Sequence, residues 1–277
     1  MTFGKLHDFS RLCLHTITTK PLSIEEAADS YSAAGIKGMT IWRDALQNRN
    51  IHLTGERIRK NGLDIVSLCR GGFFPSLSET GRKNAIADNK KLIDEAAEAG
   101  APLVVLVCGA VRGQTLETSR HQIIKALDEI VPYAGKQGIK LGIEPLHPMY
   151  ADTRSAINTM KQANDIAMMF RSPYLGVVID VFHVWWDPDL ESEIIRCGQK
   201  GNIFAFHLSD WKADMEHMLN DRGLMGEGFI PLQAIREWVE NAGFNGFLEV
   251  EIFSNRYWSL DQKKFIRMIK DAYITYC

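Results

Sequence analysis

Short apolar runs alternate with longer amphipathic segments along almost the whole chain. The run from Leu175 to Ile179 is the clearest, because every position is apolar or glycine, which is typical of a strand buried on both faces of a parallel sheet. Several amphipathic segments stop at a glycine, as helices often do; these glycines are Gly35, Gly62, Gly100 and Gly138. The pattern therefore predicts a series of strand and helix pairs.

Eight such pairs follow one another without a break in composition. The expected strands are residues 12–18, 37–42, 64–69, 103–108, 140–144, 175–180, 203–208 and 246–252, and the expected helices are residues 23–35, 54–61, 84–99, 116–137, 155–170, 190–198, 231–242 and 260–273. Right-handed crossovers then favour one closed (β/α)8 TIM barrel, an α/β fold, as a single domain over residues 1–277. An open doubly wound sheet is the alternative, but the first turn, from His15 to Thr19, lacks its glycine fingerprint.

Four of the expected strands carry, at their last or next-to-last position, a side chain that can bind a metal: Glu144, Asp180, His207 and Glu251. A carboxylate at the end of a buried strand is costly to desolvate unless a cation or hydrogen-bond donors meet it. Because parallel barrel strands end at one mouth, the four residues predict one divalent ion there. Mixed carboxylate and imidazole ligands suit manganese, our first expectation, and also cobalt, zinc or magnesium. Glu249 faces the same way as Glu251 and is the alternative ligand, one layer deeper.

Charge and cysteine content exclude several classes of protein. A formal charge of −2 and a pI near 6.5 offer no broad attraction to nucleic acid or to an anionic membrane. The five cysteines are scattered without a CxxC spacing, which indicates reduced thiols and a cytoplasmic protein. The N-terminus has no signal-like apolar segment, and no apolar run approaches membrane-spanning length. Whether the chain forms a homo-oligomer stays open.

Four short motifs lie in order at the ends of the last four strands: Ile143-Glu144-Pro145, Ile179-Asp180-x-x-His183, the run from Phe206 to Trp211, and the run from Glu249 to Phe253. In these motifs, and over essentially its whole length, the chain resembles the xylose isomerase-like TIM-barrel superfamily of sugar isomerases and epimerases, which also includes endonuclease IV. The resemblance implies that Glu144, Asp180, His207 and Glu251 bind one divalent metal. It also implies that His183 contacts the substrate, and that Glu144 and Glu251 exchange the substrate proton.

Other residues near the predicted mouth are candidates on weaker grounds. His147 lies in a loop pinned by Pro145 and Pro148 and could act as a base over the metal, or lie on the surface. Substrate contacts are expected from Arg70, Arg222, His15 and Trp42, although each could equally cap or pack against a neighbouring element.

Two classes of reaction compete. The first is proton transfer on a sugar or keto-polyol through an enediolate, as isomerisation or epimerisation, with β-elimination by a lyase or dehydratase as the runner-up. The second is phosphodiester hydrolysis, which in the resembling nucleases needs three metals and histidines at the ends of the third and fourth strands. This chain has Cys69-Arg70 and Cys108-Gly109 there. The sequence thus disfavours DNA repair and favours a small carbohydrate or polyol as substrate.

Overall fold

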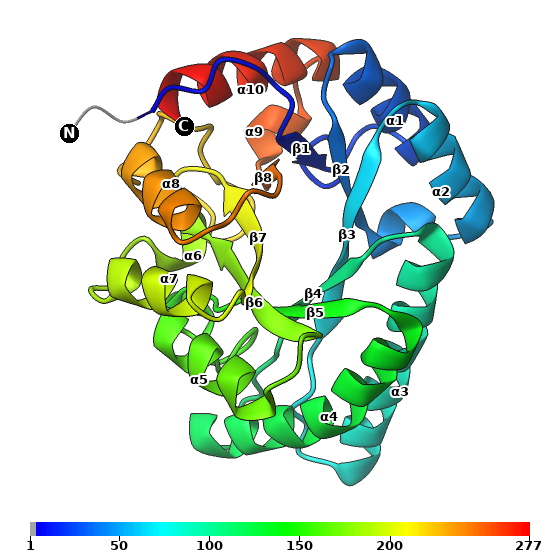
Figure 1. The fold of residues 1–277 in the computed structure, drawn as a ribbon, viewed down its shortest axis with the longest axis vertical. Helices are drawn as coiled ribbons and strands as arrows, with labels where there is room; N and C mark the ends of the chain where they lie inside the picture. The colour runs from blue at the N-terminus through cyan, green and yellow to red at the C-terminus, as the bar shows by residue number, and fades with distance from the viewer. Residues whose placement is uncertain (1–3) are drawn as a thin grey trace.

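The computed structural model describes residues 4–277, in which eight parallel strands close into a barrel in chain order (Figure 1). The strands are β1 Leu12–His15, β2 Gly38–Trp42, β3 Asp64–Gly72, β4 Leu103–Val107, β5 Lys140–Ile143, β6 Leu175–Asp180, β7 Ile203–Leu208 and β8 Leu248–Val250. Hydrogen bonding between β1 and β8 closes the ring, with Cys13 opposite Glu249. The (β/α)8 prediction is therefore confirmed, and the open-sheet alternative is wrong.

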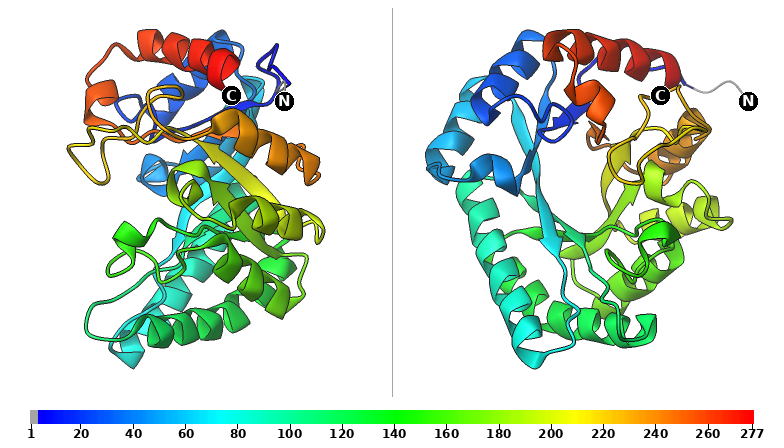
Figure 2. Two further views of the ribbon diagram at one scale, coloured as in Figure 1. Left: turned by 90° about the vertical axis from the view of Figure 1, so that its left-hand side faces the viewer. Right: turned by 180° about the vertical axis from the view of Figure 1, so that it is seen from behind.

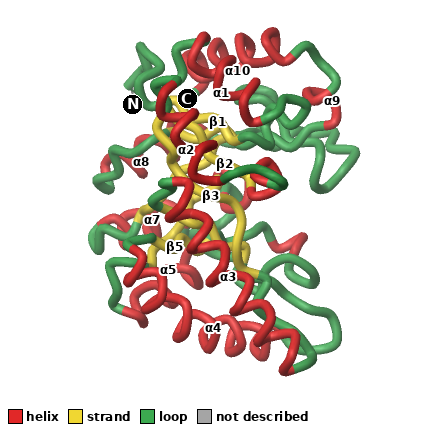
Figure 3. Tube along the Cα trace, turned by 90° about the vertical axis from the view of Figure 1, so that its right-hand side faces the viewer, coloured by secondary structure: helices red, strands yellow, loops and turns green. Residues whose placement is uncertain are grey.

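The helices form an outer ring around the strands (Figures 1 and 3). They are α1 Ile24–Ala33, η1 Arg43–Leu46, α2 Ile51–Lys60, α3 Glu79–Ala99, α4 Leu116–Gln137, η2 Pro148–Tyr150, α5 Met160–Phe170, α6 Val181–Val184, α7 Leu190–Gly198, α8 Leu232–Asn241, α9 Asn255–Trp258 and α10 Gln262–Tyr276. The short elements η1, η2, α6 and α9 were not predicted. Across residues 4–277, no helix combines the length and apolar character needed to cross a membrane.

Helix starts differ from the predictions because side-chain caps, not apolar spacing, set them. Helix α2 begins after Asn50, whose side chain accepts the Leu53 N–H, while Thr54 bonds back to the Asn50 carbonyl inside the helix. Thr54 is therefore not the N-cap. Helix α3 begins earlier than expected, after Ser78, and α5 begins later, after Thr159. The first turn of α3 is polar and exposed and carries no apolar periodicity; the sequence signal for its start was the capping residue Ser78 with Glu79 after it.

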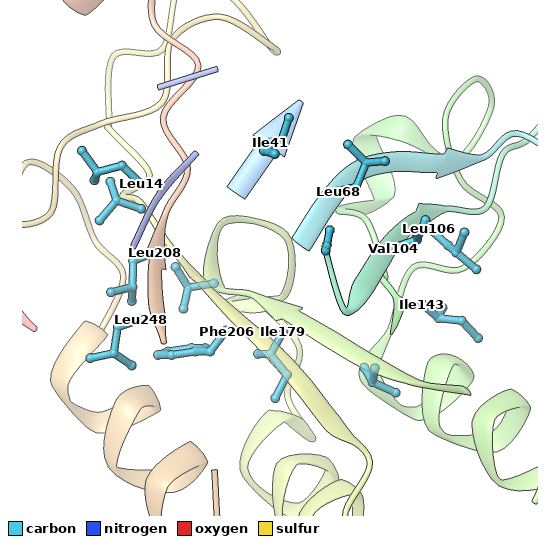
Figure 4. Packing of buried hydrophobic residues seen from close by; sticks show 14 of the residues in the cluster. Leu14, Ile41, Leu68, Val104, Leu106, Ile143, Ile179, Phe206, Leu208 and Leu248 are labelled. Carbon is cyan, nitrogen blue, oxygen red and sulfur yellow. The ribbon is translucent and has the colours of Figure 1, made fainter. Parts of the chain in front are cut away.

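The main hydrophobic core lies between the barrel and its helices (Figure 4). Strand residues alternate between this core and the barrel interior. In β7, for example, Phe206 and Leu208 pack outward in the core, which turns His207 inward. The same alternation turns Glu249 and Glu251 inward on either side of the core residue Val250. The alternation of side chains along each strand thus places polar side chains in the barrel interior, near its mouth.

Two strand ends differ from the prediction in ways that matter for the mouth. Strand β1 stops at His15 instead of Thr18, because the chain turns back there and the Thr18 N–H bonds to the His15 carbonyl. Strand β3 continues past Cys69 to Gly72, because Asn89 holds both the N–H and the carbonyl of Gly72. Arg70 therefore belongs to a strand and not to a loop.

Candidate metal centre and active site

Four side chains from the ends of neighbouring strands converge inside the mouth of the barrel: Glu144, Asp180, His207 and Glu251. One ligand atom from each lies within 4.8 Å of the others. All four are buried, with exposed fractions of 5% or less. These are the residues in which the sequence predicted a metal site, and the fold brings them together because β5, β6, β7 and β8 are adjacent in the barrel.

The hydrogen bonding of this cluster fits a cation. Within residues 4–277, Glu144 Oε1 and both ring nitrogens of His207 are buried without a hydrogen-bond partner. His207 Nδ1 faces Glu144 Oε1 at 3.2 Å, a distance at which a nitrogen lone pair and a carboxylate need a proton or a metal ion between them. Burial alone would lower the pKa of His207, but the glutamates around it raise that pKa. Three carboxylates and one imidazole are a donor set suited to a divalent first-row metal.

Arg222 reaches into the same cluster from the loop after β7. Its Nη1 donates to Asp180 Oδ2 at 2.8 Å and to Glu251 Oε2 at 2.9 Å, and its Nη2 lies 3.0 Å from His183 Nε2. Burial raises the pKa of Asp180 to about 7, although Arg222 opposes the rise. Burial also disfavours ionisation of Glu251, but the charges of Arg222 and His15 outweigh it and hold that pKa well below its ordinary value.

Beside this cation, His183 is neutral. Burial and the charge of Arg222 both lower the pKa of His183, so its Nε2 accepts a hydrogen bond from the guanidinium.

A second group of polar side chains lies one layer deeper. Glu249 accepts a hydrogen bond from Thr40 Oγ1 at 2.5 Å and lies 3.1 Å from His15 Nε2. His15 Nδ1 lies 3.1 Å from Glu251 Oε1, so the ring bridges the two glutamates. Burial alone would lower the pKa of His15, but the two carboxylates raise it well above its ordinary value. His15 is fully buried, which corrects its prediction as a substrate contact: it supports Glu251 from below.

A narrow cavity of about 80 Å³ opens above the cluster. Six predicted site residues line it: Trp42, Arg70, Glu144, His183, Arg222 and Glu251. Asp180 and His207 are fully buried and do not line it. Sequence reasoning missed Tyr150, Arg154 and Phe253, which also line the cavity. The available signal was an aromatic residue and a cation in the loop directly after a strand that carries a site glutamate.

His147 lies away from this cavity, contrary to the prediction that it acts as a base over the metal. Its Nδ1 accepts the Met149 N–H at 3.2 Å, and its ring lies against Trp211, with the ring centres 4.7 Å apart, and against Trp186. Burial lowers the pKa of His147. Pro148 opens η2 directly after His147, and the imidazole packs in an aromatic cluster instead of over the proposed metal site.

The loop from Asp210 to Phe229 folds back beside the mouth. The Asp210 carboxylate organises it by accepting four backbone N–H groups, from Trp211, Gly226, Gly228 and Ile230. The loop after β5 meets it where the Tyr150 hydroxyl donates to the Met218 carbonyl. Figure 2 shows both loops, in green and yellow, projecting from the same end of the barrel. Together they bring Arg154 and Arg222 to one cavity.

Comparison with known proteins agrees with this architecture. The family model of the xylose isomerase-like TIM barrel matches residues 28–271. An inosose isomerase of Bacillus licheniformis is 28% identical over 205 residues, which cover 72% of this chain and 71% of that protein.

Two solved structures superpose on nearly the whole chain. A protein from Sinorhizobium meliloti 1021 is 40% identical and superposes with a TM-score of 0.94 over 98% of this chain and 99% of its own. The IOLI protein with a bound zinc atom is 22% identical and superposes with a TM-score of 0.84 over 96% of this chain and 99% of its own, a likeness in fold alone. Since the family model spans most of the chain and the barrel closes as that model describes, the protein belongs to the xylose isomerase-like TIM-barrel family.

Proposed function

We propose that the protein is a divalent-metal-dependent isomerase or epimerase of a sugar or keto-polyol, acting by proton transfer through an enediolate. One observation carries the proposal: Glu144 and Glu251, from the ends of β5 and β8, line one cavity and belong to one cluster of metal-ligating groups. The inosose isomerase relative supports a keto-polyol as the substrate class.

The four proposed metal ligands are Glu144, Asp180, His207 and Glu251. A divalent ion held there would polarise adjacent carbonyl and hydroxyl oxygens and acidify the carbon-bound proton beside them. Glu251 or Glu144 then takes that proton, and the other glutamate returns a proton, which sets the outcome as isomerisation or epimerisation. His15 holds Glu251 from below, so its carboxylate keeps one orientation during the transfer.

The remaining cavity residues orient the substrate in this proposal. Neutral His183 and the guanidinium of Arg222 offer hydrogen bonds to hydroxyl groups. Trp42 and Phe253, whose ring centres lie 5.1 Å apart, form an apolar wall that excludes water from the reacting carbons. β-Elimination is the weaker candidate, because His147, the base considered for it, does not line the cavity.

The proposed ion is single, with manganese as the expected metal. In the part of the chain that the structure describes, the other group of potential ligands consists of His15, His207 and Glu251, so it shares two members with the first. The zinc atom bound by the IOLI protein, which has the same fold, supports a divalent ion as the cofactor. We also propose a cytoplasmic location, supported by five buried cysteines that form no disulfide.

Metal analysis and hydrogen exchange test the proposal together. The parent protein should retain about one divalent ion per chain, and Glu144→Gln and His207→Asn should lose most of it. Glu129→Gln, on the outer face of α4, is the matched control and should keep the ion. Incubated with candidate ketoses in deuterated water, the loaded parent should place deuterium beside the carbonyl. Full metal content in both site variants would contradict the ligand assignment, and turnover that survives Glu144→Gln and Glu251→Gln would contradict the mechanism.

A further inference from the structure

Two arginines on the wall of the cavity have no acidic partner among the described residues. Arg70 comes from β3 and Arg154 from the loop between β5 and α5, and both line the cavity. Within residues 4–277, neither guanidinium forms a salt bridge or a side-chain hydrogen bond; instead, Arg70 lies over the rings of Phe73 at 4.7 Å and Trp42 at 5.6 Å, and Arg154 lies over Tyr150 at 5.8 Å. Arg222, by contrast, is paired with two carboxylates in the same cavity.

The two guanidinium groups also act on each other. Burial lowers the pKa of Arg70, and the positive charge of Arg154 lowers it further. Two like charges on one partly buried wall repel each other, and the repulsion is relieved when an anion comes between them. Their contacts to aromatic rings use none of their N–H groups in a hydrogen bond within residues 4–277, so those groups can donate to a ligand.

The acidic side chains deeper in the site have closer partners than these two arginines. Glu144, Asp180 and Glu251 belong to the proposed metal cluster, and Arg222 contacts Asp180 at 2.8 Å and Glu251 at 2.9 Å. Glu249 lies 3.1 Å from His15 Nε2. Within residues 4–277, Arg70 and Arg154 line the cavity without a contact of this kind.

Building on the proposed function, we infer that the substrate carries an oxyanion, a carboxylate or a phosphate, which Arg70 and Arg154 bind while the carbonyl end lies over the glutamates. Guanidinium groups match both oxyanions through paired N–H bonds. Arg70 and Arg154 line the same cavity as Glu144 and Glu251, so a ligand bound over the two glutamates lies beside both arginines. The site is then selective for acidic or phosphorylated keto-polyols over neutral ones.

Three ketoses with one carbon skeleton test the inference: D-fructose, D-fructuronate and D-fructose 6-phosphate. Their binding to the manganese-loaded protein is measured by calorimetry at low salt. At least one of the two anions should bind about tenfold tighter than fructose, the size expected for a charge-assisted pair. Comparison of D-fructuronate with D-fructose 6-phosphate identifies whether a carboxylate or a phosphate binds better. Added salt should reduce the advantage of the anion and leave fructose unaffected.

Substitution of each arginine tests whether that residue provides the tighter binding of the anion, which is called the anion advantage below. Arg70→Gln and Arg154→Gln should each bring the affinity for the anion most of the way down to the affinity for fructose measured in the same variant. Arg112→Gln is the control, since Arg112 is exposed, pairs with Asp152 and does not line the cavity. Because Arg70 packs on Trp42, its loss could disturb folding; Arg70→Lys keeps the charge and should keep part of the advantage, and Arg154→Gln tests the pair from the loop side.

The inference and the proposed function fail separately. Equal binding of all three ketoses, or an anion advantage that persists in the double Arg70→Gln, Arg154→Gln variant, would overturn the oxyanion site. Exchange of deuterium into neutral and anionic ketoses at equal rates would do the same while leaving the isomerase proposal intact. Tight, arginine-dependent anion binding without turnover or exchange of any ketose would support the oxyanion site and count against the isomerase.

Discussion

Glu249 and Glu251 lie two residues apart, face the same interior, and are both buried, yet their surroundings differ. Glu249 belongs to a lower layer, with Thr40 and His15, in which its Oε2 has two close protein partners. Glu251 belongs to an upper layer, with Glu144, Asp180, His207 and Arg222, in which several buried polar atoms have no partner within residues 4–277. The glutamate of the lower layer thus has close protein partners, whereas polar atoms of the upper layer are buried without them in the described part of the chain.

This difference indicates that the lower layer stabilises the fold and that the upper layer binds a ligand. A buried carboxylate that is satisfied by the protein stabilises the fold and has no reason to bind a ligand. A buried cluster that is left unsatisfied costs stability unless something else completes it, and such strain is concentrated at functional sites. His15 joins the layers, since one ring nitrogen faces each glutamate. The following substitutions test whether the two layers have these separate roles.

The largest expected effect is on turnover in the upper layer. Glu251→Gln should lower kcat/KM by roughly 10³-fold, because it removes a proposed base and a proposed metal ligand together. Metal content, measured by elemental analysis, should fall in parallel. Glu249→Gln is the matched change one layer down and should keep most of its metal. An equal loss of metal in both variants would remove the distinction between the layers.

The next largest expected effect is a loss in the free energy of unfolding when Arg222 is substituted. Arg222→Met leaves Asp180 and Glu251 facing each other without a cation, at a cost of about 3–5 kcal/mol in protein stripped of metal. Added manganese should recover part of that loss, since a divalent ion neutralises the same carboxylates. Denaturant unfolding with and without manganese measures both. Arg236→Met, which removes another buried and paired arginine remote from the mouth, should show no metal-dependent recovery.

Glu249→Gln should destabilise the protein by about 1–3 kcal/mol, because the charge that pairs with His15 is lost and a buried hydrogen-bond network is disturbed. Unlike the Arg222 variant, it should lose the same stability with and without metal. Unfolding in guanidinium chloride, in the presence and absence of a chelator, provides the comparison. A purely metal-dependent loss would instead place Glu249 among the ligands.

The smallest effect is expected at His147. Because its ring packs on Trp211 and does not line the cavity, His147→Ala should change kcat/KM by less than about threefold. Steady-state kinetics with any substrate found by the exchange assay is sufficient. A fall comparable to that of Glu251→Gln would restore His147 as a base and favour β-elimination.

The sequence predicted the barrel and most of the upper layer for the same reason. Strand periodicity is local, so an apolar run with Glu144 or Asp180 at its end fixes both the strand and the side chain's place near the mouth. Eight such runs in order then require their ends to meet. The alternation around Val250 likewise turns Glu249 and Glu251 inward, with Glu249 deeper.

Loop residues could not be placed in this way. Nothing local distinguishes Arg154, which lines the cavity, from His147, which does not, although both follow β5. Their positions depend on distant contacts: His147 packs on Trp211, and the Tyr150 hydroxyl binds the Met218 carbonyl. His15 was expected to contact the substrate because it lies near the end of the first strand; the turn after it and two glutamates from the end of the chain decide its place.

Sequence alone thus determined which strand carries each carboxylate, since side-chain alternation and burial act within a few residues. Only the tertiary structure decided which groups are left unpaired. Arg222 pairs with Asp180, 42 residues before it, and with Glu251, 29 residues after it, whereas Arg70 and Arg154 contact aromatic rings instead of acids within residues 4–277. Charge compensation depends on distance in space, and no spacing along the chain encodes it.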